Sequence, residues 1–205
     1  MAMIIQHDND RPVIHETAYI APNAIISGNV TIGANCRILY GAVISAESGS
    51  VSIGDSCIIM ENAVIRGTSH FPTTIGNNVL IGPHAHLSGC SIEDNVFVAT
   101  GSSIFSGAYI GTQSTIKING VVHIKTRLPQ GSVVPIGWIA IGDPVEILSP
   151  DQDERITEIL KELDFPKTVF GIDREILKRS LMTEMTSRYG RRLLSHRRDV
   201  ILDEI

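Results

Sequence analysis

The stretch from Ile75 to Cys90, IGNNVLIGPHAHLSGC, consists of units of about six residues that open on Ile75, Ile81 and Leu87. A small or branched residue stands four places after each opening residue. A period of six differs from that of an α-helix, about 3.6 residues, and from that of a strand, about 2. It is typical of a solenoid in which short strands alternate with tight corners.

The same period extends from this stretch toward both ends of the chain. The opening residues are Ile14, Ile20, Ile26, Ile32, Ile38, Ile44, Ile53, Ile59, Ile65, Ile75, Ile81, Leu87, Ile92, Val98, Ile104, Ile110, Ile116 and Val122. The step length changes after Ile44, Ile65 and Leu87, and a twelve-residue step separates Val122 from Val134. Each change follows the third unit of a triplet, as expected if three units make one coil and excursions leave from one edge. The pattern predicts an all-β solenoid, a parallel β-helix of six to seven triangular coils within residues 1–148, followed by a C-terminal helical extension at residues 149–205.

The fourth and fifth residues of the units support this interpretation. The fourth is often Asn or Gly, as at Asn23, Asn29 and Gly101, and these residues tolerate the positive φ of a sharp corner. The fifth is small, as the inside of a narrow prism requires. By this count Cys36 and Cys57 stack in adjacent coils as buried thiols.

Composition limits the classes of function. A net charge of −5 argues against nucleic acid as a partner. The chain contains no long apolar run and no apolar leader, so we expect no membrane partner and a cytoplasmic location. The three cysteines lack metal-type spacing and are expected to be reduced.

The C-terminal extension carries two helical patterns. The first is expected to be capped by Ser149 and to bury Ile156 and Ile159, and the second to be capped by Asp173. A cluster of arginines follows at Arg188, Arg191, Arg192, Arg197 and Arg198. This cluster is either a solvated helix face or a surface for an acidic partner.

The sequence between residues 11 and 148, with RPVIHETAYIAPNA, IGPHAHLSGCSI and IGDPVEIL, resembles the gamma-class carbonic anhydrases and their hexapeptide-repeat relatives. The resemblance implies a left-handed β-helix and a homotrimer. It also implies a zinc ion between subunits, held by three histidines and carrying a water whose pKa the metal lowers.

This sequence has other residues where the resemblance places the three histidines. Arg66 follows Val64-Ile65, Pro83 follows Ile81-Gly82, and Ser88 lies in Leu87-Ser88-Gly89-Cys90. The family's catalytic acid is retained as Glu61. We therefore expect no metal at the family positions and no resident cofactor.

Counting the repeats predicts a different kind of site, for an anion, in the same region. Ser45, Arg66 and Ser88 are each the second residue of a third unit, so they stack in successive coils roughly 5 Å apart. An arginine between two hydroxyls suits a small anion such as a carboxylate or a phosphate. Our main hypothesis is a homotrimeric binding or scaffold protein that does not hydrate CO2. The sequence does not identify its small-molecule ligand or a protein partner.

Two enzymatic alternatives remain open. His70, His84 and His86 lie close in sequence to the replaced positions and would be the ligands of a relocated zinc site in a carbonic anhydrase. An acyltransferase would use His70, in an excursion loop, as general base on acetyl-CoA bound between subunits. Glu61 is the candidate acid in either case. Metal analysis, CO2 hydration and thiol-release assays separate these alternatives.

Overall fold

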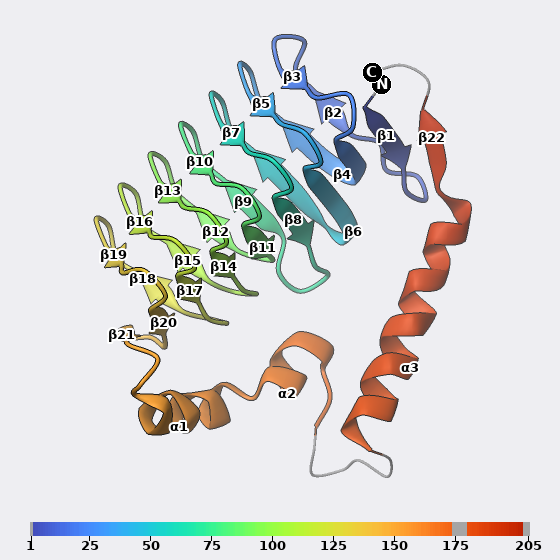
Figure 1. The fold of residues 1–205 in the computed structure, drawn as a ribbon. Coiled ribbons are helices and arrows are strands. Elements are labelled where there is room, and N and C mark those ends of the chain that lie inside the picture. Colours follow the sequence, from blue (N-terminus) through green and yellow to red (C-terminus); the bar gives the residue numbers. More distant parts are fainter. Residues whose placement is uncertain (1, 174–179, 203–205) are drawn as a thin grey trace.

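The computed structural model describes residues 2–173 and 180–202. Its strands wind into a left-handed, three-sided prism (Figure 1), which confirms the predicted solenoid. The first side holds β2 (Val13–Ile14), β9 (Thr73–Ile75), β12 (Ser91–Ile92), β15 (Tyr109–Ile110) and β18 (Arg127–Leu128). The second side holds β3 (Tyr19–Ile20), β5 (Arg37–Ile38), β7 (Ile58–Ile59), β10 (Leu80–Ile81), β13 (Phe97–Val98), β16 (Thr115–Ile116) and β19 (Val133–Val134).

The third side carries the residues of the candidate site. It holds β1 (Met3–Gln6), β8 (Val64–Gly67), β11 (His86–Ser88), β14 (Ser103–Ile104), β17 (Val121–Val122), β20 (Ile139–Ile141) and β21 (Glu146–Leu148). Two long strands, β4 (Ile25–Ile32) and β6 (Val43–Ile53), turn the edge from the third side to the first.

Aliphatic residues stack along the axis and form the core. On the third side Ile44 is in register with Ile65, Ile65 with Leu87, and Leu87 with Ile104, and all four are completely buried. Stacks of this kind exclude water along the whole prism, and burial of apolar area is the main stabilising term. The predicted stacking of Ile44, Ile65 and Leu87 is confirmed.

The pairings of the described strands define seven coils, and β1 adds part of one before the first. The excursions after Ile44 and Ile65 leave from the same edge, as predicted. One predicted irregularity is wrong. Leu128 lies in register with Ile110 on the first side, so the steps between Val122 and Val134 are regular.

The Asn and Gly residues at the fourth position of the units adopt positive φ with two exceptions. Positive φ occurs at the fourth residue of most units, including Asn62 and His84, where φ is 58° and 57°. Asn23 and Asn29 do not adopt positive φ. The bend in β4 is formed instead by Gly28, whose φ is 78°. The neighbouring strand β6 approaches so closely that a Cβ atom at Gly28 would lie 2.6 Å from the carbonyl oxygen of Ala46.

The residues after the prism form more elements than the sequence predicted. They are α1 (Asp153–Leu163), α2 (Phe165–Phe170), α3 (Leu181–Leu193), the 3₁₀ turn η1 (Leu194–Arg198) and β22 (Val200–Leu202). The N-cap of α1 is Gln152 rather than Ser149, and the predicted burial of Ile156 and Ile159 is confirmed. The N-cap of α3 is Ser180.

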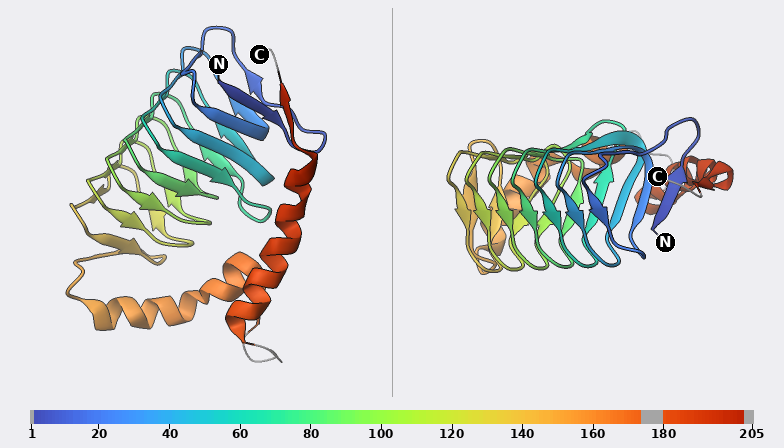
Figure 2. Two further views of the ribbon diagram at one scale, coloured as in Figure 1. Left: turned by 45° about the vertical axis from the view of Figure 1, so that its right-hand side comes forward. Right: turned by 90° about the horizontal axis from the view of Figure 1, so that it is seen from above.

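The last strand, β22, pairs antiparallel with β1, so the two ends of the described chain lie together (Figures 1 and 2). Helix α3 runs beside the coils at that end of the prism (Figure 2). Arg198 forms an ion pair with Asp8, and Arg188 pairs with Glu184 within α3. Part of the arginine cluster is therefore neutralised within the chain.

Each described helix is too short or too polar to cross a membrane. The thiols of Cys36, Cys57 and Cys90 are free and buried, and Cys36 and Cys57 lie in adjacent coils as predicted.

Candidate functional site

An outward-facing row of side chains on the third side forms the centre of the candidate site. Ser45 is in register with Arg66, and Arg66 with Ser88. The stacking predicted from the repeat count is therefore confirmed. Successive side chains along a strand point to opposite faces of the sheet. Because Ile44, Ile65 and Leu87 point into the prism, the next residue on each strand points outward.

Arg66 is bound from two directions. Its Nη2 donates to Oε1 of Glu47 at 2.6 Å and to the hydroxyl of Tyr189 at 2.6 Å. The Tyr189 hydroxyl also lies 3.4 Å from Oε2 of Glu47. The Tyr189 hydroxyl of helix α3 thus lies against the surface of the solenoid. The Glu47 carboxylate, on the long strand β6, lies beside the Arg66 guanidinium.

The pKa of Arg66 reflects this environment. Partial burial lowers it, but the hydrogen bonds with Tyr189 and Glu47 and the negative charge of Glu47 outweigh burial, so the pKa lies above its ordinary value. Arg66 is a permanent cation here. Glu61, the candidate acid, lies at a corner, where its main-chain oxygen accepts from the main-chain N–H of His84. The carboxylate that pairs with Arg66 is that of Glu47.

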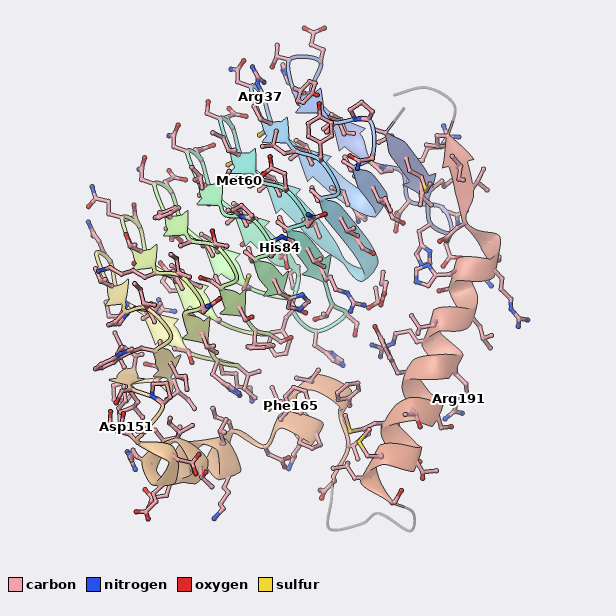
Figure 3. All side chains as sticks on the ribbon, in the orientation of Figure 1. Arg37, Met60, His84, Asp151, Phe165 and Arg191 are labelled. Carbon is pink, nitrogen blue, oxygen red and sulfur yellow. The ribbon has the colours of Figure 1, made fainter. Side chains whose placement is uncertain are left out.

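The three histidines suggested as relocated ligands occupy different parts of the surface. His70 is exposed in the excursion loop between β8 and β9, and His84 is exposed at a corner. Figure 3 shows His84 over the middle coils, away from the helix that carries Arg191. His86 is half-buried on β11, beside the Arg66 row. Within the described residues of one chain, these three side chains do not form a group close enough to share an ion.

A second row on the third side continues toward the later coils. The ring of Phe105 lies between those of His86 and His123, with centroid distances of 6.3 and 5.7 Å. Burial lowers the pKa of both histidines, and the charge of Arg66 lowers that of His86 further. Nδ1 of His123 is buried without a hydrogen-bond partner among the described residues. The row is a neutral, partly apolar surface next to a cation.

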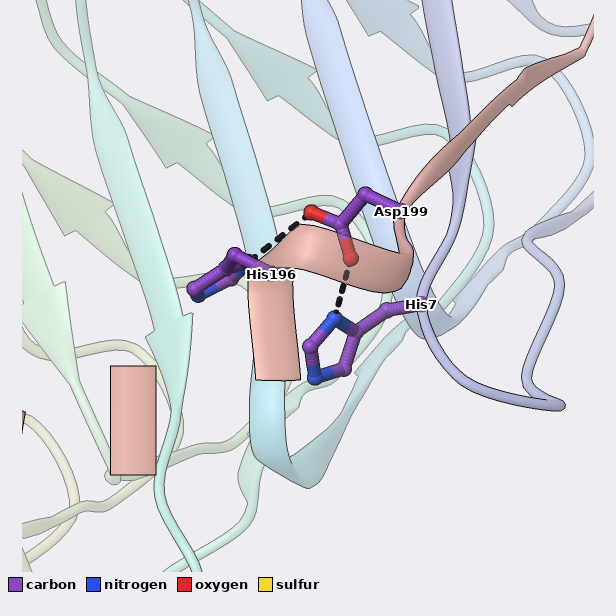
Figure 4. A group of neighbouring side chains, drawn as sticks. All are labelled: His7, His196 and Asp199. Atoms are coloured by element: carbon purple, nitrogen blue, oxygen red, sulfur yellow. Dashed lines mark hydrogen bonds and ion pairs between the residues drawn. The ribbon is translucent and has the colours of Figure 1, made fainter. Parts of the chain in front are cut away.

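Three further side chains meet at the edge of the first coil. Asp199 lies between His7 and His196, and its two oxygens are 2.6 and 2.8 Å from their Nδ1 atoms (Figure 4). No pattern in the sequence predicts this cluster, because its members lie far apart along the chain and show no local spacing. Only the pairing of β1 with β22 brings them together.

Comparison with known proteins identifies the family. The model of the bacterial transferase hexapeptide, six repeats, matches residues 11–46 and 72–106. A probable carbonic anhydrase of Methanocaldococcus jannaschii is 34% identical over 147 residues, which cover 72% of this chain and 89% of that protein. The chain belongs to the gamma carbonic anhydrase-like proteins with hexapeptide repeats.

Two further relatives are similar over smaller shares of their own length. The mitochondrial gamma carbonic anhydrase 1 of Arabidopsis thaliana is 33% identical over 155 residues, which cover 72% of this chain and 54% of that protein. The chain therefore spans about half the length of that relative. The carnitine operon protein CaiE of Escherichia coli is 32% identical over 116 residues, 57% of this chain and 59% of that protein.

Solved structures of similar shape agree on the fold. A putative acetyltransferase from Bacillus cereus has a TM-score of 0.54 at 20% identity and covers 94% of this chain and 98% of its own. The UDP-N-acetylglucosamine O-acyltransferase from Moraxella catarrhalis has a TM-score of 0.51 at 22% identity, covering 90% and 89%. These identities support the solenoid and no more.

The site of this gamma carbonic anhydrase-like chain combines one cation, two hydroxyls, a phenol and a neutral aromatic row. Ser45, Ser88 and Tyr189 can donate or accept hydrogen bonds, whereas Arg66 only donates. Such a set can hold an anion or a polar small molecule.

Proposed function

We propose that this protein is a homotrimeric, gamma carbonic anhydrase-like protein that binds a small anionic molecule at the Arg66 row and does not hydrate CO2. The observation that supports the proposal most directly is the Arg66 guanidinium, held by Glu47 and Tyr189 at a position where the family resemblance implies a zinc ligand. Proteins of this family are typically trimers, which supports the assembly.

Zinc does not fit this row. A guanidinium has no lone pair to offer a metal and stays protonated, so Arg66 repels a divalent cation. Its position is fixed, because Nη2 already bonds to Glu47 and Tyr189. Ser88 adds only one neutral oxygen, and Pro83, the remaining position, has no donor.

An anion fits the row better than zinc does, although the negative charge of Glu47 offsets part of the positive charge of Arg66. Among the described residues, the hydrogen bonds of Arg66 use Nη2 alone and leave the N–H groups of Nε and Nη1 for a ligand. The Arg66 side chain is 32% exposed, so a ligand can reach it. Charge-assisted hydrogen bonds from a guanidinium to a carboxylate or phosphate are about twice as strong as neutral ones.

One experiment with two assays tests the proposal. CO2 hydration is measured for the wild-type protein and for the double variant Arg66→His, Ser88→His, each after zinc loading and with metal content determined. Binding of inorganic phosphate and of succinate is measured by calorimetry for the wild type and for Arg66→Gln, with Arg37→Gln, on the second side, as the matched control.

We expect no hydration above background in the wild type and a gain of zinc in the double variant relative to it. Arg66→Gln should weaken anion binding by about tenfold or more, since a hydrogen bond to a charged group contributes about 1.5–3 kcal/mol, and Arg37→Gln should not. Hydration of CO2 by the wild type would overturn the proposal, as would binding of neither anion. Thiol release from acetyl-CoA that depends on His70 would favour the acyltransferase alternative.

A further inference from the structure

We propose that His7, His196 and Asp199 form a site for a divalent transition-metal ion such as zinc, which joins the C-terminal segment to the first coil. His7 follows β1, whereas His196 lies in η1 and Asp199 directly after it. These segments are adjacent because β22 pairs with β1. The inference goes beyond the proposed function and concerns a different set of side chains.

Three potential ligands lie close together, with the Asp199 carboxylate between the two imidazoles. Both imidazoles turn Nδ1 toward the same carboxylate, at 2.6 Å for His7 and 2.8 Å for His196, and the rings lie 4.7 Å apart (Figure 4). The ligand atoms of all three residues lie within 4.8 Å of one another. Zinc takes nitrogen and carboxylate oxygen ligands at about 2.0–2.2 Å, so a small outward shift of Asp199 makes room for the ion.

Each ring has an oxygen near its outer nitrogen. Nε2 of His7 lies 3.3 Å from Oγ of Ser195, and Nε2 of His196 lies 3.7 Å from Oε1 of Glu47. Without a metal, the short contacts of the two Nδ1 atoms with Asp199 are hydrogen bonds in which Nδ1 donates. With an ion bound at Nδ1, each ring would carry its proton on Nε2, next to these oxygens, as metal-bound histidines do.

The cluster is shielded from water on the side of β1, where His7 is 5% exposed. The side chains of Asp199 and His196 are 21% and 34% exposed, so an ion can reach the ligands from their side.

The charges around the cluster leave Asp199 as the carboxylate for the ion. Arg198 pairs with Asp8 at 2.6 Å, and Arg66 pairs with Glu47 at 2.6 Å. Within the described chain, Asp199 forms ion pairs with His7 and His196. Two imidazoles and one carboxylate suit zinc, cobalt, nickel or copper better than magnesium or calcium, which prefer all-oxygen sites.

The full-length protein, freed of metal with EDTA and dialysed, is titrated with Co²⁺ alone and with Zn²⁺ alone. The variants are His7→Asn and His196→Asn, because the Asn amide can still donate to Asp199 from about the position of Nδ1 but lacks the imidazole lone pair. The matched controls are His15→Asn and His84→Asn, both exposed histidines outside the cluster.

We expect one equivalent of metal in the wild type and in both controls, with visible Co²⁺ absorption typical of nitrogen and oxygen ligands. Zinc at a hundredfold excess over Kd should raise Tm by roughly 5 °C or more. Each cluster variant should bind at least tenfold more weakly and lose most of the Tm rise. CO2 hydration is not a readout here, so this result and that of the Arg66 experiment are independent.

Absence of metal binding in the wild type would overturn the proposal, and so would unchanged binding in both cluster variants. Loss of binding in His84→Asn alone would place the ion elsewhere. Should an Asn variant not fold, NMR of the Co²⁺-bound wild type decides: paramagnetic shifts must appear at the paired residues Ile5 and Ile201, and their absence there would refute the site.

Discussion

The side chain of His123 shows how a single residue ties the stability of this protein to pH. It is half-buried beside Phe105, and burial lowers its pKa below the ordinary value. The unfolded chain therefore takes up the proton at a higher pH than the folded chain does. The stability gained from the neutral ring is present above the unfolded pKa, near 6.5, and is lost as pH falls toward the folded pKa.

We expect the free energy of unfolding to fall between pH 7 and pH 5, and to fall less in His123→Gln, which cannot titrate. Urea unfolding followed by circular dichroism at several pH values measures this. His84→Gln, at an exposed corner, is the control and should keep the wild-type slope. Equal slopes in His123→Gln and the wild type would contradict the explanation.

For single residues, the sequence predicted the position of a side chain on the solenoid better than it predicted the contacts of that side chain. The stacking of Ser45, Arg66 and Ser88 follows from counting, because a regular solenoid turns spacing into adjacency. The contacts of Arg66 with Glu47 and Tyr189 could not be predicted. Glu47 lies within an excursion that breaks the count, and Tyr189 comes from a helix whose docking depends on tertiary contacts.

Among the elements, β4 bends at a single glycine, Gly28. Its pairing with β6 shifts register between Gly28 and Val30. A Cβ atom at Gly28 would meet the carbonyl oxygen of Ala46 at 2.6 Å, whereas at Gly131 nothing lies within 4 Å. Both glycines have positive φ, 78° and 70°, so they differ in crowding and not in backbone conformation.

We expect Gly131→Ala to cost about 1–2 kcal/mol, the penalty for a side chain in the left-handed region. Gly28→Ala should cost about 3 kcal/mol or more, because the backbone of β6 must also move. Denaturant unfolding of both variants measures the difference. Equal losses of unfolding free energy in the two variants would contradict this expectation, because they would show that the backbone of β6 moves at no cost in stability.

Element boundaries were predictable where the chain repeats and not where it stops repeating. Positive φ was expected at Asn62, since Asn tolerates it cheaply, and was missed at Gly28, because the corner there moves one residue earlier. Helix α2 lies in a segment that reads as a linker, and β22 is too short to show an alternating pattern.

For the whole molecule, the outer surface of the second side supports assembly into trimers. Ile58, Phe97 and Val133 occupy one outward row there and are 37%, 43% and 46% exposed. Thr115 interrupts the row between Phe97 and Val133, but exposed apolar side chains gathered on one face in this way are typical of interfaces between proteins. A closed cyclic assembly covers it in every copy.

We expect sedimentation velocity at micromolar concentration to give three times the 22.2 kDa mass of one chain. Phe97→Glu should shift the population toward monomer by placing a charge in the apolar row. Tyr109→Glu, on the first side, should not, because Arg127 lies over that ring and can pair with the new carboxylate. A stable wild-type monomer would refute the trimer.

The pairing of β22 with β1 has a consequence for the order in which the chain is made. Ile4 leaves the ribosome before the coils that follow it in the sequence, and its partner Leu202 leaves after them. The coils can stack behind β1 while translation continues, but the outer edge of β1 stays open until β22 emerges. An unpaired strand edge is a template for association with other chains. During synthesis, the strand that begins the solenoid is therefore the last part of it to be protected.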